Sequence, residues 1–406
     1  MINRRSLLPM FFTVFIDLVG LGIIIPVLAT ILLTDNNSLM AGTSLATRTI
    51  TLGFLVATFP LAQFFGAPIL GALSDRYGRK PILLIALVGT LLGYLLFAEG
   101  IHTNHLVLLF VSRFIDGFTG GNISIILSSI ADVSDSERSK TQNFGIIGMA
   151  FGLGFVLGPY IGGKLSDPTL VEWFNYTTPF WFAAGLTVCN IILVALFFRE
   201  TLAERLRTKL NFFTGFNHLK EAFRLPSLKV LFWVIFLIEF GFNFMTQFFQ
   251  VFLIQKFAFT QSDIGDIFAY FSLWIAFTQG SITQPLAKLF APYRIIRWSI
   301  LLLAVTLLLL LIPNRTYGLL IIIPFVALFQ GLTQPNLTTL ISQASNAHDQ
   351  GKILGIKQSI TSLGQAIPPI IAGFVVLLHL NLPIIVGSVA IALAWVVLVV
   401  GYKAKN

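Results

Sequence analysis

The sequence predicts an all-α membrane protein with twelve transmembrane helices, arranged as two six-helix pseudo-repeat bundles. Three observations lead to this prediction. Hydrophobic residues make up 56% of the chain and charged residues only 11%, whereas a soluble domain carries about 25% charged residues. Apolar runs of about 20 residues, the length that crosses a bilayer, recur between polar breaks. Segments of the first half also resemble segments of the second half, in the same order.

The longest polar break, at 200–227, divides the chain into two halves with six apolar runs each. We therefore predict a bundle at 1–199, a cytoplasmic linker at 200–227 and a second bundle at 228–406. The first run is too long and too rich in glycine for a signal peptide, so we expect it to be retained as a helix. The predicted spans lie near 8–33, 49–72, 81–99, 105–131, 140–163, 179–199, 228–255, 261–286, 294–313, 316–344, 350–378 and 382–402.

Basic residues predict which side of the membrane each loop faces, because cytoplasmic loops are enriched in Lys and Arg. If both termini are cytoplasmic, most of the 26 Lys and Arg residues lie in inside segments. The outside loops then hold only Arg48, Lys164, Lys256 and Arg315. Topology therefore explains the net charge of +9, and nucleic-acid binding is not expected. The single cysteine, Cys189, excludes a disulfide within the chain and a cysteine-ligated metal.

The internal repeat is visible in two pairs of segments. The stretch at 117–129, GFTGGNISIILSS, aligns with GLTQPNLTTLISQ at 331–343. Further along, GIIGMAFGLGFVLGPYIGG at 145–163 aligns with GIKQSITSLGQAIPPIIAG at 355–373. Parallel repeats of this kind are typical of transporters that bind their substrate at the interface between the repeats.

The loop between the second and third spans carries the most specific motif, GALSDRYGRK. It resembles the signature loop of the major facilitator superfamily, G-x-x-x-D-R-x-G-R-K, at every fixed position. The alternative is an ordinary cytoplasmic loop that is basic for topological reasons alone. The matched residues, which we predict to form a cytoplasmic gate, are Gly71, Asp75, Arg76, Gly78, Arg79 and Lys80.

Three further motifs resemble those of the twelve-span drug:proton antiporters, and of tetracycline/proton antiporters in particular. The first span contains DLVGLGIIIPVLA, and the fourth has Arg113 and Gly117 at the positions of an R-x-x-x-G motif. Asp116 stands where that family often has Gln, the first-span motif ends in Ala29 instead of proline, and the second copy of the signature loop, QPLAKLFAPYR, is degenerate. The fifth span resembles the antiporter motif through Gly154, Gly158, Pro159, Gly162 and Gly163.

The resemblance implies roles for these residues. Asp75 would lie at the positive N-terminal end of the eleventh span and hold the two halves together on the cytoplasmic side. Arg79 would pair with an acidic residue at the end of the fourth span, where Asp132 is best placed. The glycines of the fifth span allow close helix approach, and Pro159 bends the helix. We expect this strip to pack helices and not to contact the substrate.

Charged residues within the spans are candidates for function, because each costs at least ~2.5 kcal/mol at the bilayer centre. Asp17 and Glu239 lie at equivalent depths in the first and seventh spans, and Arg113 and Asp116 share one face of the fourth. We predict that Asp17, Arg113 and Asp116 exchange a proton as their surroundings change between states. The alternatives are a permanently satisfied carboxylate at Asp17 and an ion pair that only fixes packing at Arg113 and Asp116.

Amide side chains form stripes on the seventh, tenth and eleventh spans, where exposure to lipid would be costly. We predict that they line a substrate cavity together with Glu239, which would favour cationic compounds; the alternative is hydrogen bonding between helices. The predicted cavity residues are Glu239, Asn243, Gln247, Gln250, Gln330, Gln334, Asn336, Gln358, Ser362 and Gln365.

The sequence predicts a secondary active transporter that exports amphiphilic or aromatic molecules in exchange for protons. Uptake of a metabolite or siderophore-like solute is the alternative, and a non-transporting membrane sensor is a more distant one. No phosphate-binding loop, metal-ligand spacing or nucleophile elbow occurs, so neither an enzyme nor a cofactor or metal is expected. We expect a monomer that spans a bacterial inner membrane with both termini in the cytoplasm.

Overall fold

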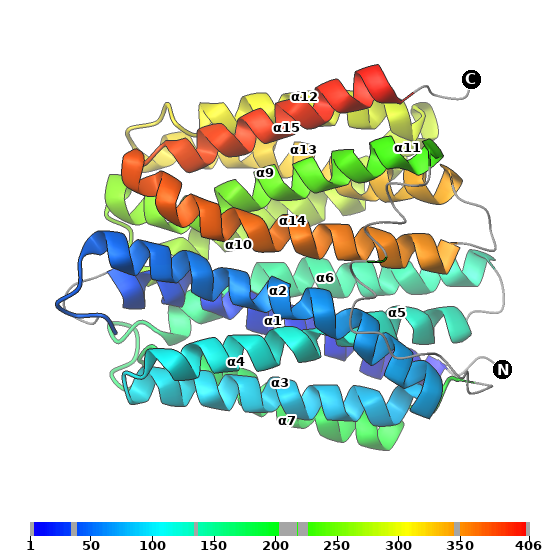
Figure 1. Ribbon diagram of the computed structural model, residues 1–406, viewed down its shortest axis with the longest axis horizontal. Coiled ribbons are helices and arrows are strands. Elements are labelled where there is room, and N and C mark those ends of the chain that lie inside the picture. Colours follow the sequence, from blue (N-terminus) through cyan, green and yellow to red (C-terminus); the bar gives the residue numbers. More distant parts are fainter. Residues whose placement is uncertain are drawn as a thin grey trace. The chain divides into compact units, whose positions relative to one another are not determined.

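Long helices joined by short turns form the computed structural model, which describes residues 4–33, 39–133, 137–202, 217, 226–344 and 350–402. These residues contain twelve helical spans and no strand (Figure 1). A 3-10 turn, η1, interrupts the fourth span and a π-helical turn, η2, interrupts the eighth. The elements are α1 (Arg4–Leu33), α2 (Leu45–Tyr77), α3 (Arg79–His102), α4 (Leu106–Thr119), η1 (Gly120–Asn122), α5 (Ile123–Asp132), α6 (Glu137–Leu165), α7 (Thr178–Phe197), α9 (Pro226–Phe257), α10 (Gln261–Phe277), η2 (Thr278–Ile282), α11 (Thr283–Leu289), α12 (Pro292–Leu309), α13 (Thr316–Ala344), α14 (Gln350–Leu378) and α15 (Leu382–Gly401).

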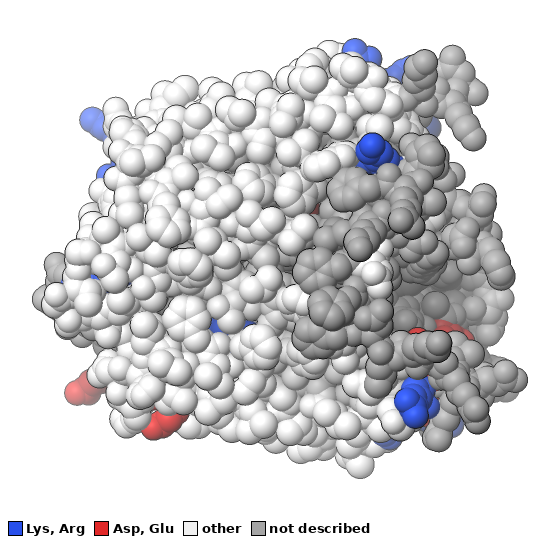
Figure 2. Space-filling view, viewed as in Figure 1, with Lys and Arg blue, Asp and Glu red and all other residues white. Residues whose placement is uncertain are grey.

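Most of these helices have the length and composition of membrane spans. Ten of them, among the described residues, are long and apolar enough to cross a bilayer. Large apolar side chains such as Trp181, Leu196 and Val400 are exposed on their outer faces. On the face drawn in Figure 2, the charged side chains of the described residues lie mainly near the edges, and uncharged side chains cover most of the described surface between them. An apolar surface of this extent requires lipid around it, so the predicted all-α membrane fold is confirmed.

Helix packing divides the chain into two compact units. The first unit holds Met1–Ala41, Thr58–Thr214 and Gln261–Ala269, and the second holds Gly42–Ala57, Gly215–Thr260 and Tyr270–Asn406. The beginning of α2 thus packs with helices from the second half of the chain, and the beginning of α10 packs with helices from the first. Residues 203–216 and 218–225 of the predicted linker lie outside the described residues, and the division into two bundles joined by this linker stays a prediction.

In the first unit, α1 and α6 approach each other along a strip of glycines. A Cβ atom added to Gly158 would lie 2.8 Å from the Cα atom of Gly22, and one added to Gly162 would lie 2.5 Å from the carbonyl oxygen of Ile23. No side chain fits there, so glycine allows the two backbones to touch. In the same unit α3 lies between α4 and α7 and contacts both (Figure 1). The glycine strip fixes the position of α1, which carries Asp17, and the three-helix layer fixes the position of α4, which carries Arg113 and Asp116.

In the second unit, α9 lies between α14 and α15 and contacts both (Figure 1). The backbones of α9 and α15 meet at Gly241, where an added Cβ atom would lie 2.5 Å from the carbonyl oxygen of Gly387. Hydroxyl groups tie further helices together: Ser388 on α15 donates to the carbonyl oxygen of Ala304 on α12 at 2.7 Å. Phe244 and Phe248 of α9 are fully buried in this packing. The polar residues of α9, among them Glu239 and Asn243, lie on a different stripe of the helix from these two phenylalanines.

Candidate functional site

Asp17 on α1 is held by an amide from a break in the fourth span. The Nδ2 atom of Asn122 donates to Oδ2 of Asp17 at 2.7 Å. Asn122 ends the 3-10 turn that follows α4, where Gly121 brings the chain so close to α2 that a Cβ atom would lie 2.5 Å from the backbone nitrogen of Ala67. The other carboxylate oxygen, Oδ1, is buried and accepts no hydrogen bond from any described residue. Asp17 therefore keeps one oxygen that is able to bind a proton.

Arg113 and Asp116 form a buried ion pair one helical turn apart on α4. The Nη1 atom of Arg113 lies 3.3 Å from Oδ2 of Asp116, and both side chains are less than one-tenth exposed. The guanidinium also lies over the ring of Phe59 on α2, 4.5 Å from its centroid, where a cation is favourably placed. Asp17 and Asp116 are close enough to interact electrostatically. The structure thus brings the three predicted proton-coupling residues into one cluster, in which Arg113 and Asp116 are buried and Asp17 is partly buried.

Tyr94 on α3 belongs to this cluster, although sequence reasoning did not select it. Its side chain is buried and close enough to Asp17, Arg113 and Asp116 to interact with them electrostatically. The hydroxyl group fills the space at Gly20, where an added Cβ atom would overlap it, and Gly20 lies one turn after Asp17 on α1. Tyrosine occurs in many apolar spans as part of the packing, so no signal in the sequence singles out Tyr94.

Glu239 on α9 is the centre of a second polar cluster, built from three helices of the second unit. Its carboxylate accepts hydrogen bonds from Gln334 on α13 at 2.8 Å and from Asn243 and Gln365 on α9 and α14 at 3.4 Å each. Lys357 of α14 interacts electrostatically with Glu239 and donates to the hydroxyl of Thr338 at 2.7 Å. Lys357 therefore belongs to the interior of the unit and was missed as a member of this site.

The remaining predicted cavity residues lie on the same three helices. Among the described residues, none of them forms a hydrogen bond with Glu239. Gln250, Gln330, Asn336 and Ser362 are buried, whereas Gln247 and Gln358 are partly exposed. Asn336 donates to the carbonyl oxygen of Leu332 one turn earlier at 2.8 Å, as an amide does when it satisfies its own helix. The amide stripes thus include a cluster around Glu239 and, outside it, Gln250 and Asn336, whose amides donate to the backbone of their own helices.

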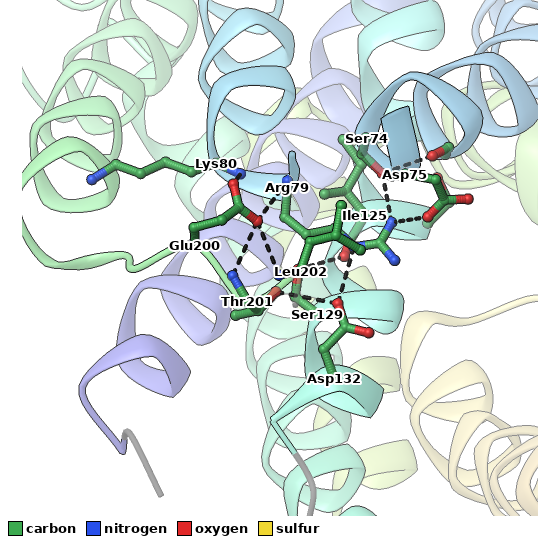
Figure 3. A network of polar contacts seen from close by, with 12 residues as sticks. Ser74, Asp75, Arg79, Lys80, Ile125, Ser129, Asp132, Glu200, Thr201 and Leu202 are labelled. Carbon is green, nitrogen blue, oxygen red and sulfur yellow. Dashed lines mark hydrogen bonds and ion pairs between the residues drawn. The ribbon is translucent and has the colours of Figure 1, made fainter. Parts of the chain in front are cut away.

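The predicted gate residues form a network around Arg79 at the beginning of α3 (Figure 3). The guanidinium pairs with Asp75 at 2.5 Å and with Asp132 at 3.1 Å, and it donates to the hydroxyl of Ser74 at 2.7 Å. The pairing of Arg79 with Asp132 is the one that the sequence predicts. Gly78 adopts a φ of 110°, which side chains rarely tolerate, so the turn between α2 and α3 requires glycine. The remaining gate residues lie around this turn: Gly71 packs on Ser124, Arg76 lies over the ring of Tyr77, and Lys80 donates to the carbonyl oxygen of Ala195.

Glu200, just after α7, completes this network and was not selected from the sequence. Its carboxylate accepts hydrogen bonds from the backbone nitrogens of Arg79 at 2.9 Å and Lys80 at 3.2 Å, the first two residues of α3 (Figure 3). It also accepts from the backbone nitrogens of Thr201 and Leu202. A carboxylate at a helix N-terminus satisfies donors that have no partner within the helix. An acidic residue that follows a span could not be assigned to a particular helix from sequence alone.

Replacing Glu200 with alanine should destabilise the beginning of α3. Loss of a helix cap costs roughly 0.5–2 kcal/mol, so we expect Glu200→Ala to lower the apparent melting temperature of the purified protein. Glu200→Gln keeps an oxygen acceptor at the same place and should lose less. Thermal unfolding in detergent measures both, and equal melting temperatures for Glu200→Ala and the unchanged protein would contradict the capping role.

The glycines of the antiporter-like motif lie on two sides of α6. Gly154, like Gly158 and Gly162, faces α1. Gly163 faces the beginning of α10, and Pro159 does so through its carbonyl oxygen, which would lie 2.6 Å from a Cβ atom added to Gly265. Beside them Lys164 donates to Ser262 and to the carboxylate of Asp266, at 2.8 Å each. These contacts pack α6 against α1 and against the beginning of α10.

Comparison with known proteins identifies the family. The model of the Major Facilitator Superfamily matches residues 10–281 and 231–405. A class H tetracycline resistance protein of Pasteurella multocida is 32% identical over 381 residues, which cover 92% of this chain and 89% of that protein. Multidrug resistance protein 1 of Bacillus subtilis is 29% identical, with 96% of this chain and 94% of that protein covered. The quinolone resistance protein NorA of Staphylococcus aureus is 27% identical, with 98% and 96% covered.

Solved structures show the same fold. The human organic anion transporter MFSD10 superimposes with a TM-score of 0.76 at 23% identity, over 98% of this chain and 99% of that one. A D-xylose-proton symporter superimposes with a TM-score of 0.76 at 14% identity, over 98% and 96%. Sequence and structure agree over nearly the whole length, and the chain belongs to the major facilitator superfamily.

Proposed function

We propose that this protein exports amphiphilic or aromatic small molecules in exchange for protons, by alternating access. The observation that carries this proposal is the cluster of Asp17, Arg113 and Asp116 in the first unit. Buried charges within a membrane span are costly and are retained where they move ions or protons. Relatives that confer resistance to tetracycline, quinolones and multiple drugs support export of such molecules.

The cluster has the parts that proton exchange requires. Asp17 has a buried oxygen that accepts no hydrogen bond from the part of the chain that the structure describes, and Asp116 lies against the cation of Arg113. Water and a neighbouring cation favour the ionised carboxylate, whereas a low-dielectric wall favours the protonated form. A rocking motion that changes these surroundings would load a proton on one side of the membrane and release it on the other. Its coupling to solute movement would make the exchange an antiport.

The other predicted residues fit roles around this cluster. We place the substrate beside Glu239 and the amides of α9, α13 and α14, the polar residues within the spans of the second unit. The Arg79 network, with Asp75 and Asp132, would act as the cytoplasmic gate. We further propose that a single chain is the functional unit and that both its termini lie in the cytoplasm of a bacterial cell.

Expression in an efflux-deficient bacterial host tests this function. Cells that carry the gene should tolerate higher concentrations of several aromatic drugs and should accumulate less fluorescent dye than cells with an empty vector. A protonophore should abolish the difference, because the export is driven by the proton gradient. Higher accumulation of a solute in expressing cells, also sensitive to the protonophore, would instead indicate uptake and overturn the proposed direction.

A further inference from the structure

The amide groups around Glu239 have a fixed orientation. Nitrogen atoms of Gln334, Asn243 and Gln365 lie 2.8, 3.4 and 3.4 Å from the carboxylate oxygens. An ionised carboxylate accepts hydrogen bonds and donates none, so each amide must present its NH₂ group to Glu239. The amide oxygen lies on the opposite side of the same planar group. Gln334 and Gln365 therefore turn their amide oxygens away from Glu239 as a consequence of its charge, whereas Asn243 is held as well by the backbone carbonyl oxygen of Glu239, to which its nitrogen donates at 2.9 Å.

A fourth amide adds to this arrangement. Gln330 lies one helical turn before Gln334 on α13 and so shares its face. Its Oε1 atom is buried and accepts no hydrogen bond from any described residue, and the Oε1 atom of Gln250, on the Glu239 stripe of α9, is in the same situation. Buried acceptors without a partner are uncommon and destabilising. On the polar stripes of α9 and α13, the buried side-chain atoms that lack a hydrogen-bond partner among the described residues are thus both acceptors, one of them a turn away from Gln334.

Lys357 weakens the attraction between Glu239 and a cationic ligand. The ammonium group interacts with the carboxylate and is held on α14 by its hydrogen bond to Thr338. A cation that approaches Glu239 is therefore repelled by Lys357 as well as attracted by the carboxylate. The charge of Lys357 partly offsets that of Glu239, whereas the orientation of the amides is unaffected.

We propose that Glu239 is a positioning residue that makes the substrate site a set of hydrogen-bond acceptors. The site would select amphiphilic aromatic molecules that carry N–H or O–H donors, whether these molecules are cationic or neutral. This proposal rests on the proposed function, since it places the substrate beside Glu239. It replaces recognition of positive charge, which the sequence favoured, with recognition of donors.

Three ligands on one aromatic scaffold separate the two modes of recognition. 2-Naphthylmethylammonium carries charge and donors, 2-naphthamide is neutral with donors, and N,N-dimethyl-2-naphthamide is neutral without them. Binding to the purified protein in lipid nanodiscs is measured by titration calorimetry for the unchanged protein, Glu239→Gln and Gln334→Met. Glu99→Gln, at an exposed position on α3, is the matched carboxylate control.

Glu239→Gln releases the amides from their fixed orientation, because glutamine both donates and accepts. We expect both donor ligands to bind about tenfold more weakly, the equivalent of about one hydrogen bond. Gln334→Met removes one oriented amide, keeps the carboxylate and should weaken the same two ligands. The dimethyl amide should bind all variants within about twofold, which shows that the variants are folded.

Loss of affinity for the ammonium ligand alone would show that Glu239 acts as a counter-charge, and would overturn the proposal. Equal losses for all three ligands, or none, would overturn it too, as would failure of the unchanged protein to bind both donor ligands. Protonophore-sensitive export in cells is measured separately. Export that persists when the donor preference is absent would retain the proposed function and reject this inference alone.

Discussion

Asp17→Asn is expected to abolish proton-driven accumulation of substrate while leaving downhill exchange of substrate measurable. Asparagine has nearly the same shape and can still accept the hydrogen bond from Asn122, which the carboxylate accepts at 2.7 Å. It cannot take up a proton, so the coupling step is lost and the substrate site remains. Transport in proteoliposomes, with a pH gradient and then with a substrate gradient alone, measures the two activities.

Asp116→Asn should also abolish proton-driven accumulation, since Asp116 is the other carboxylate of the cluster, but it leaves the buried guanidinium of Arg113 without its carboxylate and should lower stability as well. Glu99→Gln serves as the control, because it removes an exposed carboxylate from the end of α3 and should leave both activities unchanged. Normal uphill transport by Asp17→Asn would remove Asp17 from the proton pathway and assign it the satisfied, structural role that the sequence left open.

Replacing Arg113 should have the largest effect on stability. Arg113→Met leaves Asp116 as a buried carboxylate without its cation, and breaking a buried ion pair in this way costs roughly 3–5 kcal/mol. We expect a marked fall in melting temperature and in the yield of folded protein. The double variant Arg113→Met/Asp116→Asn removes both charges and should recover much of the stability, but it should not recover proton-driven transport.

Arg113→Lys distinguishes charge from shape. Lysine keeps the positive charge but loses the planar group that lies 4.5 Å from the centroid of Phe59. It should therefore be more stable than Arg113→Met and less stable than the unchanged protein, in thermal unfolding measured in the same detergent. A double variant no more stable than Arg113→Met alone would show that the ion pair does not account for the loss.

The sequence predicts the number of spans because a helix that crosses a bilayer needs about 20 consecutive apolar residues. Such a run is visible within a single stretch of sequence. Helix ends were less well predicted: the span expected at 49–72 extends as α2 from Leu45 to Tyr77. At the membrane surface a helix can continue through polar residues, and hydrophobicity does not show where such a helix ends. The breaks at Gly120–Asn122 and Thr278–Ile282 were also missed, because contacts with neighbouring helices favour them and hydrophobicity does not record these contacts.

Candidate site residues were predicted where chemistry and spacing were visible within one helix. Arg113 and Asp116 are three residues apart and form the expected pair on α4. Tyr94, Glu200 and Lys357 were missed because their partners lie on other elements, far away in the chain. The convergence of three amides on Glu239 likewise depends on the packing of α9, α13 and α14, which no single stretch of sequence encodes.

The central claim, exchange of solute for protons, is tested most directly by imposing a pH gradient on the purified protein. In proteoliposomes with an acidic lumen and sodium-free buffer, outward flow of protons should drive an exported aromatic drug into the vesicles above its external concentration. Nigericin, which dissipates the gradient, should release the accumulated drug, and vesicles with Asp17→Asn should not accumulate it. Drug flux that is indifferent to the pH gradient, or that requires sodium, would contradict the account.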